Sequence, residues 1–213
     1  MDSIAQIRQE YAAQVLLEDD LAPDPIQQFR KWWQQVIDSQ VTEPNAMTLA
    51  TASADGMPTA RVVLLKGFDE EGFTFFTNYN SYKGLQLSEN PRACLVFHWK
   101  ELERQVRIIG LVEKVPEGES DAYFKARPLG SRIGAWVSPQ SQVIDNRQWL
   151  DDTYAQREKE LEKEDIQRPP HWGGYKVMPV VVEFWQGRPS RLHDRLQYTL
   201  LEGGAWQIER LAP

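Results

Sequence analysis

Cysteine and histidine are scarce in this chain of 213 residues, which contains one cysteine and three histidines. The single cysteine, Cys94, cannot form an internal disulfide, which fits a reducing, cytoplasmic location. It lies in an apolar run without a nearby base, so we expect a buried small side chain rather than a nucleophile. The histidines have no partner cysteines, and we therefore expect no metal site.

An excess of basic residues is also missing, because the formal net charge is −7. Nucleic-acid binders usually carry a basic excess, so we expect no nucleic-acid partner, and any basic cluster would be local and suited to a small anionic ligand. No apolar stretch approaches the ~18 uninterrupted residues that read as a membrane span. The N-terminal residues lack the basic-then-apolar pattern of a secretory signal. We therefore expect no membrane partner.

Common catalytic motifs are absent as well, since the sequence has neither a glycine-rich phosphate loop of standard spacing nor a nucleophile-elbow serine. It contains instead a run of short strand-like segments joined by tight turns. This pattern predicts a mainly β fold with attached helices (α+β), built on an antiparallel sheet or barrel rather than a doubly wound parallel sheet. The length favours one main domain, residues 24–213, preceded by an N-terminal helical segment and linker, residues 1–23.

Helical and strand-like segments follow one another unevenly along the chain. Apolar residues at helical spacing predict a helix over residues 3–15, and Asp24 and Pro25 are typical of the start of a second helix. Ser81 is expected to cap a short helix that ends near Glu89. Further helices are expected at 117–127 and 146–163, and strands at 47–53, 59–67, 73–78, 93–99, 104–114, 180–186, 191–200 and 205–211.

Two cations flank an apolar run in Arg61-Val-Val-Leu-Leu-Lys66. Buried cations are costly without partners, so these two either reach solvent at the strand ends or bind a ligand. Strict alternation in a strand puts Arg61 and Lys66 on opposite faces. One ligand can contact both only if it is long, or if the strand bulges or ends between them.

A second basic segment is Arg191-Leu192-His193-Asp194-Arg195. In a strand, Arg191, His193 and Arg195 would share one face, with neighbours roughly 7 Å apart. Three such groups in a row repel one another unless an anion or a carboxylate lies between them. The segment is therefore either a face that binds an anionic or electron-rich ligand, or an edge strand with solvated arginines.

Two further places suit a phosphate group. At the start of the predicted short helix, free backbone N–H groups lie near the hydroxyls of Thr77 and Ser81 and the charge of Lys83. The other place is the end of a predicted helix and the turn after it, with Tyr123, Arg127 and Ser131. Each has a plain alternative, such as a capped helix with a surface lysine. Two such places in one acidic chain nevertheless indicate phosphorylated ligands.

Together these segments resemble the pyridoxamine/pyridoxine 5′-phosphate oxidase family. The resemblance runs from about Ile7 to the end of the chain, and the number, order and spacing of the motifs make it specific. The motifs are Arg61-Val-Val-Leu-Leu-Lys66, Phe76-Thr-Asn78, Glu103-Arg-Gln105-Val, Arg127-Pro128, Ser131-Arg-Ile-Gly-Ala-Trp-Val-Ser138, Gln140-Ser141, Trp172-Gly-Gly174, Glu183-Phe-Trp-Gln-Gly187, Arg191-Leu-His-Asp-Arg195 and Arg210-Leu-Ala-Pro213.

The resemblance implies an FMN-binding split β-barrel that works as a homodimer, with active sites at the subunit interface. It implies FMN contacts from Arg61, Val62, Val63, Leu64, Leu65, Lys66, Phe76, Thr77, Lys83, Gln105, Gln140, Ser141, Trp185 and Arg195. It implies substrate contacts from Arg8, Tyr11, Lys66, Tyr123, Arg127, Ser131, Arg191, Leu192 and His193. Arg191 and His193 would be the catalytic residues. Arg8 and Tyr11 resemble a segment that closes over the substrate, so residues 1–23 would form a lid.

The activity that the resemblance implies is oxidation of pyridoxamine 5′-phosphate or pyridoxine 5′-phosphate to pyridoxal 5′-phosphate. A hydride would pass from C4′ to flavin N5, and dioxygen would be reduced to hydrogen peroxide. One departure is Tyr82, where many members have an arginine, so one phosphate contact is expected to be lost. Three alternatives stay open: a split-barrel flavin enzyme with another small substrate, a flavin or pyridoxal phosphate binding carrier, and a plain structural domain.

Overall fold

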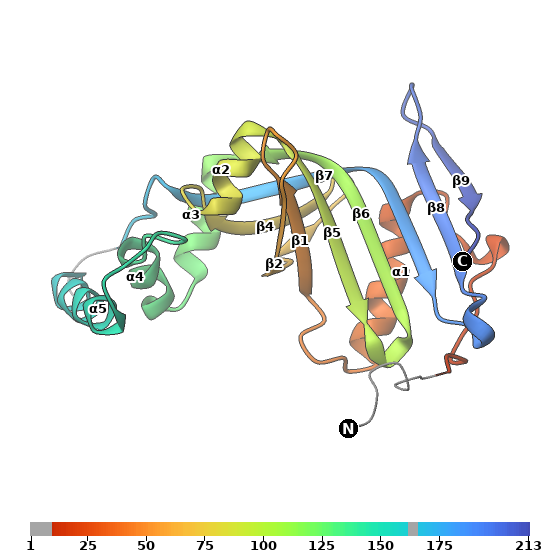
Figure 1. Cartoon of the computed structure of the whole chain (residues 1–213), viewed down its shortest axis with the longest axis horizontal. Helices are drawn as coiled ribbons and strands as arrows, with labels where there is room; N and C mark the ends of the chain where they lie inside the picture. Colours follow the sequence, from red (N-terminus) through yellow and green to blue (C-terminus); the bar gives the residue numbers. More distant parts are fainter. Residues whose placement is uncertain (1–9, 162–165) are drawn as a thin grey trace.

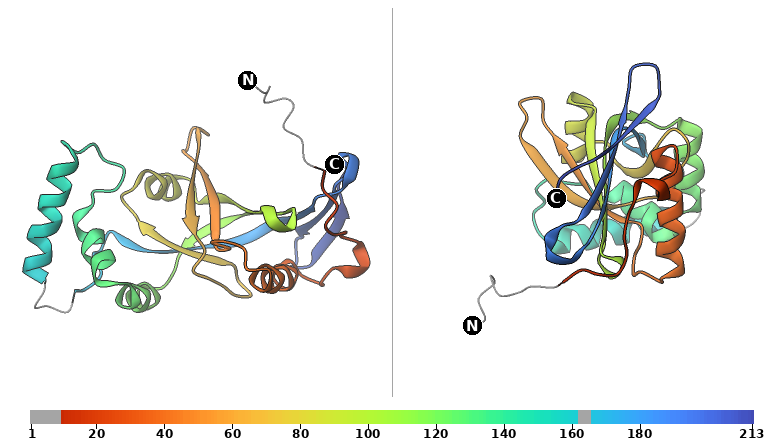
Figure 2. Two further views of the ribbon diagram at one scale, coloured as in Figure 1. Left: turned by 90° about the horizontal axis from the view of Figure 1, so that it is seen from below. Right: turned by 90° about the vertical axis from the view of Figure 1, so that its right-hand side faces the viewer.

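The structure, a computed structural model, describes residues 10–161 and 166–213. Nine strands of this part of the chain form one sheet, and their pairings are antiparallel throughout. The sheet curls into a half-barrel, with α4 and α5 at one end and the β8–β9 hairpin at the other (Figures 1 and 2). The predicted mainly β, antiparallel fold with attached helices is therefore confirmed.

The elements have the following bounds. The helices are α1 (Pro25–Asp38), α2 (Tyr82–Glu89), α3 (Glu117–Ala126), α4 (Leu129–Val137) and α5 (Arg147–Leu161), with short 3₁₀ turns at Glu18–Asp20, Lys100–Leu102 and Pro189–Arg191. The strands are β1 (Ala46–Ala52), β2 (Pro58–Leu64), β3 (Gly67–Phe68), β4 (Phe73–Asn78), β5 (Arg92–Trp99), β6 (Arg104–Lys114), β7 (Trp172–Gln186), β8 (Asp194–Leu200) and β9 (Trp206–Arg210).

Strand β7 is the reason that the sheet divides instead of closing as a simple barrel. One edge of this 15-residue strand pairs with β6. The other edge is shared, because residues 172–177 pair with β4 and residues 181–186 pair with β8. The sheet therefore forks along β7, and β8 and β9 continue away from β4. This fork separates the two ends of the molecule on which candidate site residues lie.

Helix α1 supplies much of the core. Asp24 caps it, accepting a hydrogen bond from the backbone N–H of Gln27 at 2.9 Å, and Pro25 occupies its first turn, as predicted. Its apolar face packs into the half-barrel through Phe29, which is fully buried. The ring of Phe29 lies edge-on to Phe73, at 4.9 Å between centroids, and also contacts Phe68, Phe97 and Trp99.

Phe29→Ala is expected to lower the free energy of unfolding by about 3–5 kcal/mol, because it removes a fully buried ring and leaves a cavity among other aromatic rings. Urea unfolding followed by tryptophan fluorescence measures the change. Ile37→Ala, on the same helix but 45% exposed, is the matched control and should cost far less. Equal losses for the two variants would show that Phe29 is not central to the core.

Several boundaries differ from those predicted. Residues 10–15, the described part of the predicted first helix, form no helix, and the rest of it lies outside the described residues. Strand β7 begins at Trp172 rather than at 180, because pairing with β4 extends it. Helix α4 follows Pro128, where only a turn was expected. Its residues pack against α5 and Trp172, contacts that local propensity does not contain.

The largest correction concerns residues 191–193, which were predicted to begin a strand. Strand β8 begins only at Asp194, and Arg191 ends a 3₁₀ turn. Ser190 and Arg191 have φ of 57° and 62°, a left-handed conformation that interrupts any extended run. Arg191, His193 and Arg195 therefore do not lie in a row on one strand face.

The described residues contain no helix with both the length and the apolar character needed to cross a membrane. They also contain no group of three or more His, Cys, Asp or Glu side chains placed to hold a metal ion.

Candidate active site

A cavity of about 780 Å³ opens between β2, β4, the start of α2 and the helices α3 and α4. Many of the residues predicted to bind ligands line it, although they come from five separate segments of the chain. The lining comprises Arg61, Val62, Val63, Leu64, Lys66, Phe76, Thr77, Asn78, Tyr82, Lys83, Tyr123, Arg127, Pro128, Ser131, Gln140, Ser141 and Trp172.

The cavity is basic although the chain as a whole is acidic. Its lining holds Arg61, Lys66, Lys83 and Arg127 and no aspartate or glutamate. Several cations elsewhere pair with carboxylates, as Lys176 does with Asp69 at 2.8 Å. No such ion pair involves the cavity cations within the described ranges. Clustered like charges without counter-ions are costly, so this lining favours an anionic ligand.

Arg61 and Lys66 reach the same cavity because β2 ends between them, at Leu64. The alternation that would separate them is broken there. Leu65 is buried in the core, with 5% of its surface exposed. Any ligand contact by Leu65 would therefore come from its backbone.

Lys83 is the most buried of the four cations, with 7% of its surface exposed. Ser81 caps α2, as predicted, and Lys83 follows in its first turn. Its ammonium donates to Ser81 Oγ at 3.2 Å and Thr77 Oγ1 at 3.3 Å. Burial, and next the charge of Arg61, lower the pKa of Lys83 below its ordinary value. A bound anion would act in the opposite direction and stabilise the charged ammonium.

Arg127 also lines the cavity, just after the end of α3. Its guanidinium lies over the Trp172 ring, at 4.5 Å from the centroid, and its Nη1 is buried without a hydrogen-bond partner. Burial lowers the pKa of Arg127 below its ordinary value. A buried donor without a partner is unfavourable, so Nη1 is a position at which a ligand oxygen would be stabilising.

Stacked aromatic rings form the wall beside Arg127. The rings of Phe76 and Tyr123 are nearly parallel, at 4.0 Å between centroids, and Trp172 stacks on Phe76 at 5.7 Å. Tyr123 lies one helical turn before Arg127, as predicted, and both line the cavity. Ser131, in the first turn of α4, completes this side.

The remaining predicted residues gather elsewhere, where β7 ends. Trp185 lies 4.6 Å from His193 between ring centroids, and Tyr11 packs against both rings at 5.9 and 6.0 Å. Gln105 is opposite Trp185 in the β6–β7 pairing. We call these four residues, with the adjoining Arg191, Leu192 and Arg195, the β7-end cluster. None of its members lines the cavity.

Hydrogen bonds constrain two members of this cluster. The backbone N–H of Arg188 donates to Nδ1 of His193 at 3.1 Å, and burial together with Arg191 lowers the pKa of His193. The guanidinium of Arg195 donates to the buried Glu183 carboxylate at 2.8 Å. Leu192 and Arg191 are exposed, whereas Arg8 lies outside the described residues.

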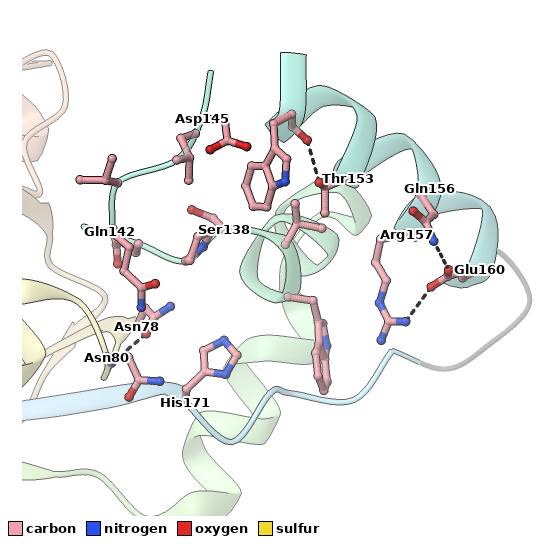
Figure 3. A pocket seen from close by; sticks show the side chains of 17 residues that line it. Asn78, Asn80, Ser138, Gln142, Asp145, Thr153, Gln156, Arg157, Glu160 and His171 are labelled. Carbon is pink, nitrogen blue, oxygen red and sulfur yellow. Dashed lines mark hydrogen bonds and ion pairs between the residues drawn. The ribbon is translucent and has the colours of Figure 1, made fainter. Parts of the chain in front are cut away.

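A second cavity, of about 710 Å³, lies between the loop after α4 and helix α5 (Figure 3). It shares Asn78 and Gln140 with the first cavity. Its arginine, Arg157, is already paired with Glu160 at 2.8 Å, and Glu160 also accepts from Gln156. Because its cation is neutralised, this cavity lacks the unpaired positive charge of the first.

Sequence reasoning missed a largely buried polar group next to Arg61, formed by Thr51, Thr59 and Gln86. One signal could have revealed it. Gln86 follows Lys83 by three residues on α2, so a polar side chain occupies the same helix face as the buried lysine.

The forked antiparallel sheet and its cation-lined cavity are the features of a protein suited to an anionic small molecule. A family model of pyridoxamine 5′-phosphate oxidase matches residues 34–159, and a model of the pyridoxine 5′-phosphate oxidase C-terminal dimerisation region matches residues 172–213. The chain belongs to the pyridoxamine 5′-phosphate oxidase family. It is an oxidoreductase with the split-barrel fold of that family, and the second match supports a homodimer.

Relatives agree with this assignment. The chain is 57% identical to a pyridoxine/pyridoxamine 5′-phosphate oxidase from Cupriavidus necator over 100% of both chains. It is 56% identical to a protein of that name from Nostoc sp., over 99% of each. Among solved structures, PhzG from Burkholderia lata in complex with tetrahydrophenazine-1-carboxylic acid superposes with a TM-score of 0.88, at 31% identity, covering 94% of this chain and 99% of that one.

Proposed function

We propose that the chain binds FMN and oxidises pyridoxamine 5′-phosphate or pyridoxine 5′-phosphate to pyridoxal 5′-phosphate. The observation that carries this proposal is the cavity with four cations and no carboxylate. Both the cofactor and the substrate bear a phosphate. The four cations of this cavity, taken as Arg61 with Lys83 and Arg127 with Lys66, would suit one phosphate for each pair.

The first group fits the FMN phosphate. Lys83 is buried with only hydroxyl partners, and the first turn of α2 offers free backbone N–H groups close by. Tyr82 is 50% exposed and lies at the cavity rim, where many family members have an arginine. Arg61 and Lys83 would therefore neutralise the FMN phosphate without a third cation. When bound, FMN would accept the hydride from C4′ and pass the electrons to dioxygen, giving hydrogen peroxide.

The second group fits the substrate phosphate. The unpartnered Nη1 of Arg127 would donate to a phosphate oxygen, with further donors from Tyr123, Ser131 and Lys66. The phosphate is the largest charge on the substrate, so this contact would fix the position of the pyridine ring. Orienting the reacting carbon in this way is a large part of the rate enhancement expected of such an enzyme.

His193 would act as a hydrogen-bond donor in its neutral form. Its Nδ1 accepts the backbone N–H of Arg188, so the ring proton of the neutral imidazole lies on Nε2. The lowered pKa of His193 favours this neutral form. Nε2–H would then orient a substrate oxygen or nitrogen, and Arg191 would lie near the ring.

The β7-end cluster would complete the cavity of a partner subunit. Trp185, Arg191 and His193 lie within the range matched by the dimerisation region, and they do not line the cavity of their own chain. In a twofold dimer each subunit would contribute its cavity to one site and its cluster to the other. Tyr11 packs against Trp185 and His193. Residues 10–23, which include Tyr11, would form part of the substrate lid.

Anaerobic mixing of the flavin-loaded protein with pyridoxamine 5′-phosphate tests the proposal. We expect the visible absorbance of the oxidised flavin to bleach and to recover in air as pyridoxal 5′-phosphate appears. A flavin that stays oxidised would instead favour a binding carrier. A protein that binds no FMN would contradict the proposal.

A second candidate is oxidation of another small anionic molecule, because the similar PhzG structure holds a tetrahydrophenazine carboxylic acid. The same experiment with unphosphorylated pyridoxine and with a carboxylated tricyclic compound separates the two. The proposed function predicts fast bleaching only with the phosphorylated substrate.

A further inference from the structure

Beside the cavity lies a buried polar group that no ligand contact explains. It consists of Thr51 on β1, Thr59 on β2 and Gln86 on α2, and we call it the threonine–glutamine cluster. Thr51 and Gln86 are each 3% exposed, and Thr59 is half-buried. Burying a polar side chain costs free energy unless its donors and acceptors are hydrogen-bonded. The donor and acceptor of each bond therefore show what this group stabilises.

The direction of the hydrogen bonds follows from Gln86. Its Nε2 donates to the carbonyl oxygen of Met57 at 3.3 Å, which leaves Oε1 as the atom facing the threonines. Oε1 accepts from Thr51 Oγ1 at 2.5 Å and from Thr59 Oγ1 at 2.7 Å. An amide oxygen cannot donate, so both hydroxyl protons point to Gln86. Both threonine oxygens are therefore left as acceptors.

Arg61 uses both of these acceptors. Its Nη1 donates to Thr51 Oγ1 at 2.6 Å and its Nη2 donates to Thr59 Oγ1 at 2.5 Å. Nη1 also donates to the carbonyl oxygen of Leu49 at 3.2 Å. These bonds occupy the edge of the guanidinium formed by Nη1 and Nη2. Nε has no partner among the described residues, and the edge formed by Nε and Nη2 is the one left for a bidentate contact.

The same helix aligns the second cation of this wall. Lys83 and Gln86 are three residues apart on α2, so one short helix holds both the ammonium and the acceptor that orients Arg61. Arg61 and Lys83 are close enough that the charge of Arg61 lowers the pKa of Lys83. Two neighbouring cations, each held by uncharged oxygens, suit a doubly charged phosphate between them.

We propose that Gln86, Thr51 and Thr59 are positioning residues, which orient Arg61 so that its free edge binds the phosphate of the flavin. The inference rests on the proposed function, because it takes FMN as the ligand of this wall. It goes further by assigning the selectivity for FMN over riboflavin, which lacks the phosphate, to a cluster that does not touch the ligand.

The test compares dissociation constants of FMN and riboflavin for the apoprotein, measured by flavin fluorescence. Thr51→Val keeps the shape of the side chain but removes the acceptor, and we expect the FMN dissociation constant to rise about tenfold. The riboflavin constant should change less than about twofold, since riboflavin presents no phosphate to Arg61. Thr51→Ser restores the hydroxyl and should bind FMN as the wild type does. Gln86→Leu should behave like Thr51→Val.

Two further measurements exclude a merely structural role. Gln28→Leu alters another buried glutamine, 2% exposed on α1, and should leave both flavin constants unchanged. In an Arg61→Met background, Thr51→Val should have no further effect on FMN binding, because it acts through Arg61.

Equal weakening of both flavins by Thr51→Val, or an undiminished effect in the Arg61→Met background, would overturn the inference. A wild-type protein that binds FMN no better than riboflavin would overturn the proposed cofactor contact itself, and the inference with it.

Discussion

Combining two inactive variants, Lys66→Ala and Arg191→Ala, is expected to give a heterodimer with about half of the wild-type activity, because each site of a twofold dimer would use one cavity and the partner's cluster. Lys66 lines the cavity, whereas Arg191 lies in the β7-end cluster outside it. In the heterodimer one site receives an intact cavity and an intact Arg191. The other site receives both defects.

Each homodimer alone should lose about 100- to 1000-fold in kcat/KM, since each lacks a positioning contact in both sites. Co-expression with two different affinity tags and tandem purification yields the heterodimer, and peroxide release measures its activity. The control pairs Lys66→Ala with Arg127→Met. Both defects then lie in cavities, so neither site is intact and activity should stay low. An inactive test heterodimer would show that Arg191 acts within its own chain. An active control would show that Lys66 and Arg127 do not act in the same site.

Arg127→Met is expected to lower kcat/KM for pyridoxine 5′-phosphate by about 100- to 1000-fold, because it removes a largely desolvated charged contact. Its effect on the much slower oxidation of unphosphorylated pyridoxine should be small. Burial lowers the pKa of Arg127, and its buried Nη1 has no partner among the described residues, which supports the proposed contact with the substrate phosphate.

Steady-state kinetics with both substrates measures this difference. Lys125→Met removes a cation from an exposed position two residues earlier, in the last turn of α3, and should leave both rates close to wild type. A parallel loss with both substrates would mean that Arg127 supports the fold or the flavin contact instead of binding the substrate phosphate.

The sequence predicted those parts of the protein that depend on neighbouring residues. Asp24 and Ser81 accept hydrogen bonds from backbone N–H groups within three residues, so the starts of α1 and α2 follow from local chemistry. Tyr123 and Arg127 are one helical turn apart and line the same cavity. Lys83 and Arg127 were predicted as separate phosphate contacts for the same reason, because each lies at an end of a predicted helix. That both line one cavity was not predicted.

Other parts could not be predicted because distant residues decide them. The prediction that Arg191, His193 and Arg195 share one strand face was wrong. Ser190 and Arg191 adopt a left-handed conformation, which an arginine rarely takes unless its surroundings stabilise it. Strand β7 is twice as long as predicted because β4 pairs with its first half. The buried acceptors behind Arg61 come from β1, β2 and α2, and no single segment contains that arrangement.

By itself the sequence determined the antiparallel class of the fold, the caps of α1 and α2 and the basic residues of the candidate site, since alternation, capping and charge are properties of short segments. Tertiary structure alone decided which of those residues meet. Strand β7 can offer one edge to two partners, and this fork puts the cavity and the β7-end cluster on different parts of one chain. Their separation is the physical reason to expect that a second copy of the chain completes the site.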